Sequence, residues 1–408
     1  EQASLTIRPY NNEKVTISGA EKLPAVQWEV YKDRIMKASV PGGIIFDQLF
    51  VNGQIQHMAR YPDYDPDASH YNGIAADAIA PERVSKWNNP AGGYVHASHR
   101  HEWGGYHWII KGKNEINELE LEGGWQNNRL MGMHPERRFV ENIFEEMDAP
   151  GEWFFDKQTQ TLYFYPPQDI DLTTAILETP QIECLFGFRG SESVPVENIH
   201  IEGLELAHTL RTFMETREQL LRSDWAIYRM GTILMEGAMH CSFTNCFFNT
   251  VGGNAVFFSN YNRHNEISGC HIADAGANGL CFVGDPKAVR STSFEYNEFV
   301  PVEELDPEAG PKTNNYPAEC LVYDNLMYRL GSVEKQVAGV QISMAQDITV
   351  SHNTIYDVPR AGINISEGTW GGHIIEHNVV LNTVLETVDH GSFNSWGRDR
   401  FWHPDYAT

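Results

Sequence analysis

The sequence predicts an all-β protein, a right-handed parallel β-helix with an inserted β-rich domain. Three features predict this fold: a degenerate repeat in the second half of the chain, short alternating strands within each repeat, and a long stretch near the N-terminus that lacks the repeat. The chain has 408 residues, of which 41% are apolar, so a core long enough for many stacked coils can form.

The repeat is marked by an Asn or Cys between two short strands, as in the segments 240–246 and 347–353. Successive markers lie 24 to 28 residues apart, which fits one coil of a parallel β-helix and is too short for a propeller blade. Stacked Asn side chains can hydrogen-bond along the axis, and the cysteines are expected as buried thiols in the core. The aligned markers are Cys246, Cys270, Asn297, Asn325, Asn353 and Asn378.

A second strand in each coil follows a glycine, as after Gly339 and Gly362. In these two strands apolar residues alternate with polar ones, so the apolar side chains are expected to point into the helix. The polar side chains would then line the outer face of a sheet, which is commonly the substrate groove in parallel β-helix enzymes. They are Gln341, Ser343, Asn364 and Ser366.

The chain is expected to divide into three parts. Residues 1–24 contain the first β-helix strands, residues 25–175 form an inserted sandwich- or barrel-like domain, and residues 176–408 form the β-helix itself. A helical insertion is expected at about 211–225. Because solenoids need capped ends and no cap follows the last repeat, we expect the C-terminal end to be truncated.

Charge and hydropathy narrow the range of partners. The chain has 30 Lys and Arg against 55 Asp and Glu, a formal charge of −25, which disfavours nucleic acid and anionic membranes. No run of apolar residues is long enough to cross a bilayer, so no membrane span is expected. Aromatic residues reach 12%, which suits stacking on the apolar faces of sugar rings.

Four carboxylates are candidate catalytic residues, because most glycosidases use a pair of them. Glu367 and Asp399 leave their strands at one edge of the predicted sheet, and Asp357 and Asp389 precede their strands at the other edge. Strands of neighbouring coils lie about 4.8 Å apart, so each pair would bring two carboxyl groups close together. Capping of turn backbone amides is the alternative role for each aspartate.

The segment 387–402 is denser in charge and aromatic rings than a plain coil turn requires. Arg presents a planar fork to hydroxyl or carboxylate groups, and Trp presents a stacking face. An aromatic end cap is the competing interpretation of the same residues. The expected substrate-binding residues, including some from neighbouring coils and the insertion, are His390, Trp396, Arg398, Arg400, Asn364, Arg360, Trp370 and His99.

Metal and cofactor chemistry is not expected. His99 and His101 can share one side of a strand, but neither an HExxH helix nor a CxxC pair is present. A sugar-contacting loop or a loop held by aromatic packing are the two interpretations of the histidine-rich stretch. Lys335 or Arg360 is a possible base for a polysaccharide lyase, yet the nearest acidic run, 303–308, fits a solvated loop better than a calcium site.

Several segments carry a resemblance to known proteins. Residues 49–53, 59–62, 138–142 and 148–153, together with the coil segment 394–399, resemble a group of bacterial parallel β-helix glycosidases. The likeness is greatest to glycoside hydrolase family 141, which includes an α-L-fucosidase acting on pectin side chains and a xylanase, and families 110 and 120 share the layout. The resemblance implies a secreted or periplasmic bacterial enzyme and leaves the sugar open.

The leading hypothesis is therefore a glycoside hydrolase that acts on plant or algal polysaccharide or its oligosaccharides by a two-carboxylate acid/base mechanism. The insertion suggests a pocket walled on one side, and hence exo action on chain ends. A polysaccharide lyase and a non-catalytic carbohydrate-binding β-helix are the alternatives. The expected partner is carbohydrate, with neither nucleic acid nor membrane, and the sequence gives no expectation for the oligomeric state.

Overall fold

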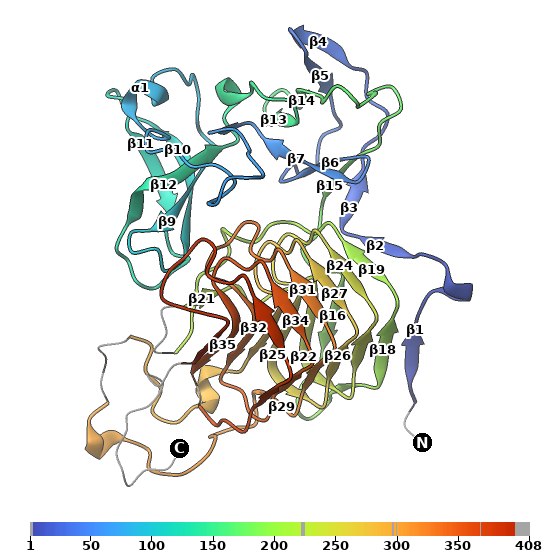
Figure 1. Cartoon of the computed structure of the whole chain (residues 1–408), viewed down its shortest axis with the longest axis vertical. Helices are drawn as coiled ribbons and strands as arrows, with labels where there is room; N and C mark the ends of the chain where they lie inside the picture. The colour runs from blue at the N-terminus through green and yellow to red at the C-terminus, as the bar shows by residue number, and fades with distance from the viewer. Residues whose placement is uncertain (1–2, 222–224, 296–297, 299, 368, 396–408) are drawn as a thin grey trace. The chain divides into compact units, whose positions relative to one another are not determined.

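The computed structural model describes residues 3–221, 225–295, 298, 300–367 and 369–395. The chain divides into two compact units (Figure 1). The first comprises residues 1–18, 126–129 and 183–408, and the second comprises residues 19–125 and 130–182. The chain passes between the units next to Ser18 and Glu183, and again at residues 126–129; the boundaries expected from the sequence were 24 and 176. The flanking strands β3 (Ala20–Lys22) and β15 (Leu177–Pro180) pair with each other in the second unit.

The first unit is a stack of coils, and in its described part each full coil contributes one strand to each of three parallel sheets. Sheet I contains β1 (Leu5–Ile7), β18 (Ile199–Glu202), β23 (Ser242–Thr244), β26 (Glu266–Ser268), β30 (Leu321–Tyr323), β33 (Thr349–Ser351) and β36 (Ile374–Glu376). Sheet II contains β2 (Thr16–Ser18), β19 (Glu205–Ala207), β24 (Phe247–Asn249), β27 (His271–Ala273), β31 (Leu326–Tyr328), β34 (Thr354–Tyr356) and β37 (Val379–Leu381).

Sheet III carries the strands that follow the glycines of the repeat. Its main path is β16 (Phe186–Arg189), β22 (Ile233–Met239), β25 (Val256–Arg263), β28 (Leu280–Val283), β32 (Ala338–Ser343), β35 (Ala361–Glu367) and β38 (Phe393–Ser395). The short strands β17 (Val196–Glu197) and β29 (Pro317–Ala318) extend its edge beside β22 and β25. Figure 1 shows these strands stacked one above another along the coil axis. The predicted parallel β-helix is confirmed.

Apolar side chains from the three sheets fill the space inside the coils. Each strand sends alternate residues inward, such as Phe243 from sheet I, Phe248 from sheet II and Phe258 from sheet III, and all three are almost fully buried. Cys241, Cys246, Cys270 and Cys320 lie in the same core as free thiols, as expected. The core therefore runs continuously along the coil axis rather than forming separate clusters.

A ladder of asparagines fixes the register of the turns between sheets I and II. The Oδ1 atom of Asn353 accepts from the backbone N–H and the Nδ2 of Asn325 at 3.0 and 2.9 Å. The Oδ1 of Asn378 accepts in the same way from Asn353, at 2.9 and 3.0 Å. Asn325 in turn caps the backbone N–H of Cys270 at 2.9 Å. Each amide bridges two coils, as the sequence predicted.

The predicted marker Asn297 lies outside the described residues. The ladder passes from Cys270 to Asn325, and β26 pairs with β30, so the coils of these two strands are neighbours in the stack. The described residues between β28 and β29 include the short 3-10 helices η3 (Pro286–Ala288) and η4 (Val302–Glu304). The step from Cys270 to Asn325 is therefore 55 residues long.

The segment expected to form a helical insertion, about 211–225, shows no helix among its described residues. It contains β20 (Glu218–Gln219), which pairs in antiparallel fashion with β21 (Ala226–Ile227). Leu220, Leu221 and Trp225 are buried against the outer face of sheet III. Packing on a flat sheet, rather than helical periodicity, explains the apolar residues of this segment.

The second unit is β-rich, as predicted for the insertion. One sheet has the order β11 (Leu119–Gly123), β10 (Gly105–Lys113), β9 (Tyr94–His99), β12 (Met133–Glu141) and β8 (Arg60–Tyr61). The other has the order β3, β15, β6 (Leu49–Val51), β7 (Gln54–Met58), β13 (Glu152–Asp156), β14 (Thr161–Phe164), β5 (Ile35–Ser39) and β4 (Glu29–Lys32). The only helices among its described residues are α1 (Pro81–Val84) and the 3-10 turn η2 (Phe144–Glu146).

A further 3-10 turn, η1 (Tyr10–Asn12), lies between the first two strands of the coil unit. In the part of the chain that the structure describes, no helix is long and apolar enough to cross a membrane.

Candidate active site

The outer face of sheet III changes from apolar to polar along the coil axis. One register position runs through β22, β25, β28, β32, β35 and β38 with Leu234, Phe257, Cys281, Gln341, Asn364 and Asn394. Leu220, Trp225 and Ile227 pack against the apolar half of this face. The polar half therefore lies in the last coils that the structure describes.

The polar half is held by amide-to-amide hydrogen bonds between coils. Asn364 donates through Nδ2 to Oε1 of Gln341 at 2.7 Å, and Asn394 donates through Nδ2 to Oδ1 of Asn364 at 2.8 Å. The Nε2 atom of Gln341 donates to the hydroxyl of Ser366 at 2.6 Å. Gln341 and Asn364 are fully buried, so these bonds fix the side-chain orientations in a site of low local dielectric.

Glu367 lies at the end of β35, where the strand contains one extra residue. Ile342 pairs with Ile365, but Ser343 pairs with Glu367, so Ser366 forms a bulge. The Ser343 hydroxyl donates to Oε1 of Glu367, and the Glu367 side chain is buried. Bulges commonly redirect side chains beside active sites.

We call the residues of this polar face the polar platform. It consists of Gln341, Ser343, Asn364, Ser366, Glu367 and Asn394. The platform combines amide donors and acceptors, hydroxyls and one buried carboxylate on neighbouring strands. These are the groups that recognise sugar hydroxyls and that can exchange a proton with them.

Arg360 and His390 stand at equivalent positions of two successive coils, immediately before or close to the platform strands. The Nε of Arg360 donates to Nδ1 of His390 at 3.2 Å. Because arginine is always a donor, this imidazole accepts at Nδ1 and carries its proton on Nε2. The Arg360 guanidinium lies 4.6 Å from the Trp225 ring centre, and the His390 ring meets the same indole edge to face at 5.8 Å.

A buried ion pair lies in the turns that lead into the platform strands. The Nζ of Lys335 donates to Oε1 of Glu386 at 2.8 Å and to the carbonyl oxygen of Gly331 at 2.9 Å. Only 4% of the lysine side chain is exposed, so the pair exists in a largely dry environment. Lys335 is therefore engaged as an ammonium ion, which disfavours the base role that a lyase would require.

Glu334, next to Lys335, is a second buried carboxyl group. Its Oε2 accepts from the Thr216 hydroxyl at 2.9 Å. Burial raises the pKa of Glu334 to about 7, and the Thr216 hydrogen bond opposes this shift. Glu334 was not among the residues expected in the site, because its partner lies 118 residues away in a segment without the repeat. No local pattern would have identified it.

The structure does not bring Asp357 and Asp389 together as equivalents. The register partner of the Asp357 turn is Asn382, whose Nδ2 donates to Oδ1 of Asp357 at 3.2 Å. Asp357 and Asp389 both lie in turns from sheet II to sheet III, between β34 and β35 and between β37 and β38. Both backbones adopt positive φ, at 55° and 68°. Asp357 directly follows its sheet II strand, whereas Asp389 is an exposed residue later in the longer turn of the next coil, so the two residues are not register partners.

Two of the expected sugar-contacting residues occupy packed positions instead. Trp370 is partly buried and packs against Tyr316 with ring centres 4.2 Å apart and ring planes tilted by 40°, beside a small apolar cluster. In the second unit His99 ends β9, is buried and stacks on Trp103 at 5.1 Å. Its Nδ1 accepts the backbone N–H of His101 at 3.0 Å, so it does not sit in an exposed loop.

Four expected site residues lie outside the described residues. They are Trp396, Arg398, Asp399 and Arg400. Of the remaining predictions, the structure brings together Glu367 and Asn364 on the platform, and Arg360 and His390 in the adjoining turns. Within the described residues, no group of three or more His, Cys, Asp or Glu side chains is arranged to hold a metal ion.

Comparison with known proteins agrees with this architecture. Residues 231–399 match a family model described as "Right handed beta helix region". The coil unit is a right-handed β-helix. The match begins two residues before β22 and covers the coils that form the platform.

Two solved structures are similar to the chain to different degrees. A protein described as "Glycoside hydrolase" superposes with a TM-score of 0.67 at 20% identity, covering 88% of this chain and 67% of that chain. A second structure, "The complex structure of XylC with xylose", gives a TM-score of 0.47 at 12% identity over 96% of this chain and 56% of that chain. No curated protein sequence matches the chain. At this identity, the first likeness concerns the fold.

Proposed function

We propose that the protein is a glycoside hydrolase acting on plant or algal polysaccharide or its oligosaccharides, with the polar platform as its substrate-binding face. The observation that carries the proposal is the buried Glu367 carboxylate within a hydrogen-bonded row of amides and hydroxyls. A protein does not need such a row for folding, because the same face of the earlier coils is apolar and packed. Buried polar networks are costly unless every member is satisfied.

In this proposal Glu367 is one member of the catalytic pair and Asp399 is the other. Strands of neighbouring coils are about 4.8 Å apart, close to the ~5–5.5 Å that separates the carboxyl groups of retaining glycosidases. Asp389 is the alternative partner, since it adjoins His390, which bonds to Arg360. Asp357 is the weakest of the four candidates, because its carboxylate holds the Asn382 turn.

Substrate contacts are proposed for the platform and for the turns beside it. Asn364 offers a fixed amide. Next to Trp225, Arg360 offers a guanidinium group and His390 offers an imidazole ring. Trp396, Arg398 and Arg400 remain proposed contacts from the sequence, as stacking and hydroxyl-binding groups. Exo action on chain ends also remains part of the proposal.

Two lines of likeness support a glycosidase over other β-helix proteins. The superposable structure at a TM-score of 0.67 is described as a glycoside hydrolase, and the segments 49–53 and 138–142 resemble family 141. We extend the proposal to a family 141 type of enzyme, secreted or periplasmic in a bacterium. The ion pair between Lys335 and Glu386 argues against a lyase.

The test is a screen of purified protein against plant and algal polysaccharides and aryl glycosides. New reducing ends without ultraviolet absorbance support the hydrolase, and Glu367→Gln must then abolish them. Absorbance from an unsaturated uronate identifies a lyase and overturns the proposal. Binding without any product identifies a non-catalytic carbohydrate-binding β-helix. Product length distinguishes exo action, which releases short ends, from internal cleavage.

A further inference from the structure

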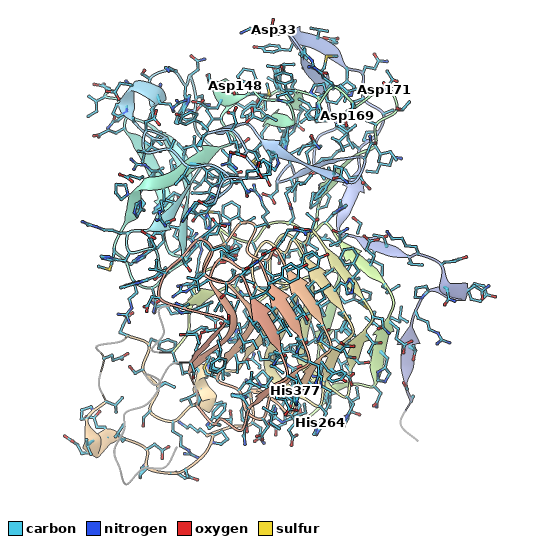
Figure 2. All side chains as sticks on the ribbon, in the orientation of Figure 1. Asp33, Asp148, Asp169, Asp171, His264 and His377 are labelled. Atoms are coloured by element: carbon cyan, nitrogen blue, oxygen red, sulfur yellow. The ribbon has the colours of Figure 1, made fainter. Side chains whose placement is uncertain are left out.

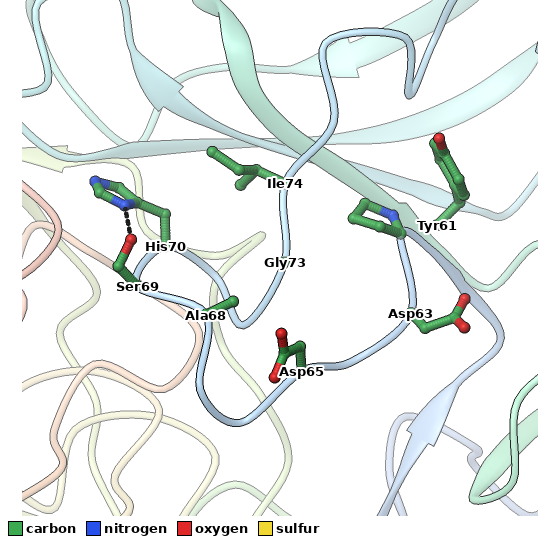
Figure 3. Close-up of a pocket in the computed structure, with 9 residues that line it drawn as sticks. Tyr61, Asp63, Asp65, Ala68, Ser69, His70, Gly73 and Ile74 are labelled. Carbon is green, nitrogen blue, oxygen red and sulfur yellow. Dashed lines mark hydrogen bonds between the residues drawn. The ribbon is translucent and has the colours of Figure 1, made fainter.

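The second unit contains a pocket of about 520 Å³ beside the loop that follows β8 (Figure 3). Its lining alternates polar and apolar groups, with Asp63, Asp65 and Ser69 among the former and Pro62 and Ile74 among the latter. A pocket of this size accommodates one or two sugar rings. It lies within the insertion and is formed by a continuous stretch of chain.

The loop that forms the pocket is rigidly organised around a buried arginine. Arg60 donates through Nε to the carbonyl oxygen of Pro62 at 2.9 Å, and through one terminal nitrogen to those of Tyr71 and Gly73 at 3.1 and 3.0 Å. Gly73 has φ of +125°, and a Cβ there would approach the Asp63 carbonyl oxygen to 2.8 Å. The pocket is therefore preformed, which lowers the entropy cost of binding.

One wall of the pocket presents a hydroxyl donor. Arg137 donates to Nε2 of His70 at 2.8 Å, so the imidazole must carry its proton on Nδ1. That Nδ1–H donates to the Ser69 hydroxyl oxygen at 2.8 Å. The Ser69 hydrogen is then directed to another acceptor. Figure 3 shows Ser69 and His70 on one side of the loop.

The facing part of the loop presents acceptors. Oδ1 of Asp65 accepts the backbone N–H of Asp67 at 3.0 Å, which fixes the carboxylate and leaves its second oxygen for a ligand. Asp63 also lines the pocket, but its carboxyl group shares a hydrogen bond with Asp148. The negative charge of Asp65, with Asp63 close by in the same loop, opposes anionic ligands, so uronates and sulfated sugars are disfavoured. A carboxylate acceptor, a hydroxyl donor and short apolar surfaces suit the hydroxyls and the apolar face of a neutral sugar ring.

We propose that this pocket is a second carbohydrate-binding site, specific for neutral sugar units. The choice of carbohydrate rests on the proposed function, but binding here requires no hydrolysis. A rigid sugar site within the insertion would hold a branched or long substrate at a point separate from the platform residues.

The test measures hydrogen exchange of residues 62–73 in the full chain carrying Glu367→Gln. The probes are xylobiose, cellobiose, galactobiose and L-fucose at high concentration, with glucuronic acid as the anionic counterpart and calcium chloride as the cation control. At least one neutral sugar is expected to slow exchange in this loop, and glucuronic acid is not. Asp65→Asn, which keeps the turn, and Ser69→Ala should each weaken the effect about tenfold, as expected for loss of a hydrogen bond to a charged or fixed group.

The matched control is Asp33→Asn, at the exposed tip of the β4–β5 hairpin of the same unit (Figure 2). It should leave the effect unchanged. The inference is overturned if no neutral sugar protects the loop, if Asp65→Asn behaves like Asp33→Asn, or if calcium alone protects it. Protection without any hydrolysis by the unmutated protein would refute the proposed function and leave this inference standing.

Discussion

Arg360 and His390 lie one coil apart and share a 3.2 Å hydrogen bond from Nε to Nδ1, with the guanidinium group and the imidazole ring both against the Trp225 indole. Arg360 is fully buried although it carries a permanent charge. The pair fixes the tautomer of His390 and connects the turns of two coils to the segment that covers the apolar half of sheet III. The Arg360–His390 pair therefore lies where the packed apolar half of the outer face of sheet III meets its polar half.

Replacing Arg360 by lysine should destabilise the protein by about 2 kcal/mol, because the planar fork over Trp225 and the bond to His390 are both lost. Urea unfolding measures the change. Arg329→Lys is the control: Arg329 is paired with Asp274 at 2.6 Å but is half exposed, so a change within about 1 kcal/mol is expected. Equal losses for the two variants would contradict a structural role for the Arg360 pair.

Glu367→Gln should lower kcat by about 10²–10⁴-fold on whichever glycoside the screen identifies, since a carboxylate that exchanges protons or attacks the sugar is lost. Folding should be retained, because glutamine can still accept from Ser343. Kinetics on the two proteins give the answer. Glu376→Gln, a carboxylate on the outer face of sheet I, is the control and should keep full activity.

Asp399→Asn should resemble Glu367→Gln, whereas Asp357→Asn should remain active. The Asp357 carboxylate serves the turn with Asn382, and asparagine preserves an acceptor there. The same assay compares these variants with Asp389→Asn. Full activity of both Asp389→Asn and Asp399→Asn would refute the proposed pairing and require a different partner for Glu367.

Asn353→Ala should cost about 2–3 kcal/mol of unfolding free energy. Its side chain accepts from Asn325 and donates to the carbonyl oxygen of Val322 at 3.0 Å, so several buried groups would lose their partners. Thermal or urea unfolding measures the loss. Asn314→Ala removes an exposed bond to Glu192 and should change stability by less than about 1 kcal/mol. A similar small effect at Asn353 would show that the ladder does not stabilise the coils.

The buried Glu334 predicts a stability that falls with rising pH. Burial raises its pKa to about 7 from an ordinary value of 4.5, so the folded state holds a proton that the unfolded state releases. The protonated Glu334 makes its full contribution to the free energy of unfolding below about pH 4.5. That contribution is lost as pH rises through about 7, a change of about 3 kcal/mol.

Urea midpoints at about pH 5 and about pH 8 measure this dependence. Glu334→Gln should reduce the difference between the two midpoints. Glu152, whose pKa burial also raises to about 7, should continue to contribute in that variant. An unchanged difference after Glu334→Gln would show that the carboxyl group ionises without penalty in the folded protein.

The β-helix could be predicted because the same residue types recur at the same turn of successive coils, which gives the sequence a visible period. Asn325, Asn353 and Asn378 are identical, lie 28 and 25 residues apart and are flanked by strands, so sequence alone revealed them. The ladder bond between Cys270 and Asn325 spans 55 residues, so a spacing of 27 or 28 residues did not mark a separate coil between them. A period identifies a coil only when the strands on both sides also pair.

The site was predictable where it depends on strand alternation and unpredictable where it depends on distant segments. Asn364 could be placed on the outer face from the alternation of its own strand, whereas Glu367 was expected only at the edge of the sheet and pairs with Ser343 through the bulge at Ser366. The contacts of Glu334 with Thr216 and of Arg360 with Trp225 join the coils to an irregular segment, which no periodicity specifies. The helix expected at 211–225 failed for the same reason, because apolar spacing cannot distinguish a helix from a loop packed on a sheet.

The extra residue in β35 also affects how this face can change during evolution. In a strictly alternating strand every second side chain points outward, so substitution alone cannot place two consecutive side chains on the outer face. Because Ser366 and Glu367 are consecutive and both bond to outward-facing partners, an insertion has supplied a hydroxyl without displacing the carboxylate. We therefore expect related chains to differ at this strand by insertions or deletions of one residue as well as by substitutions. Strand length would then change which chemical groups the outer face of such coils presents.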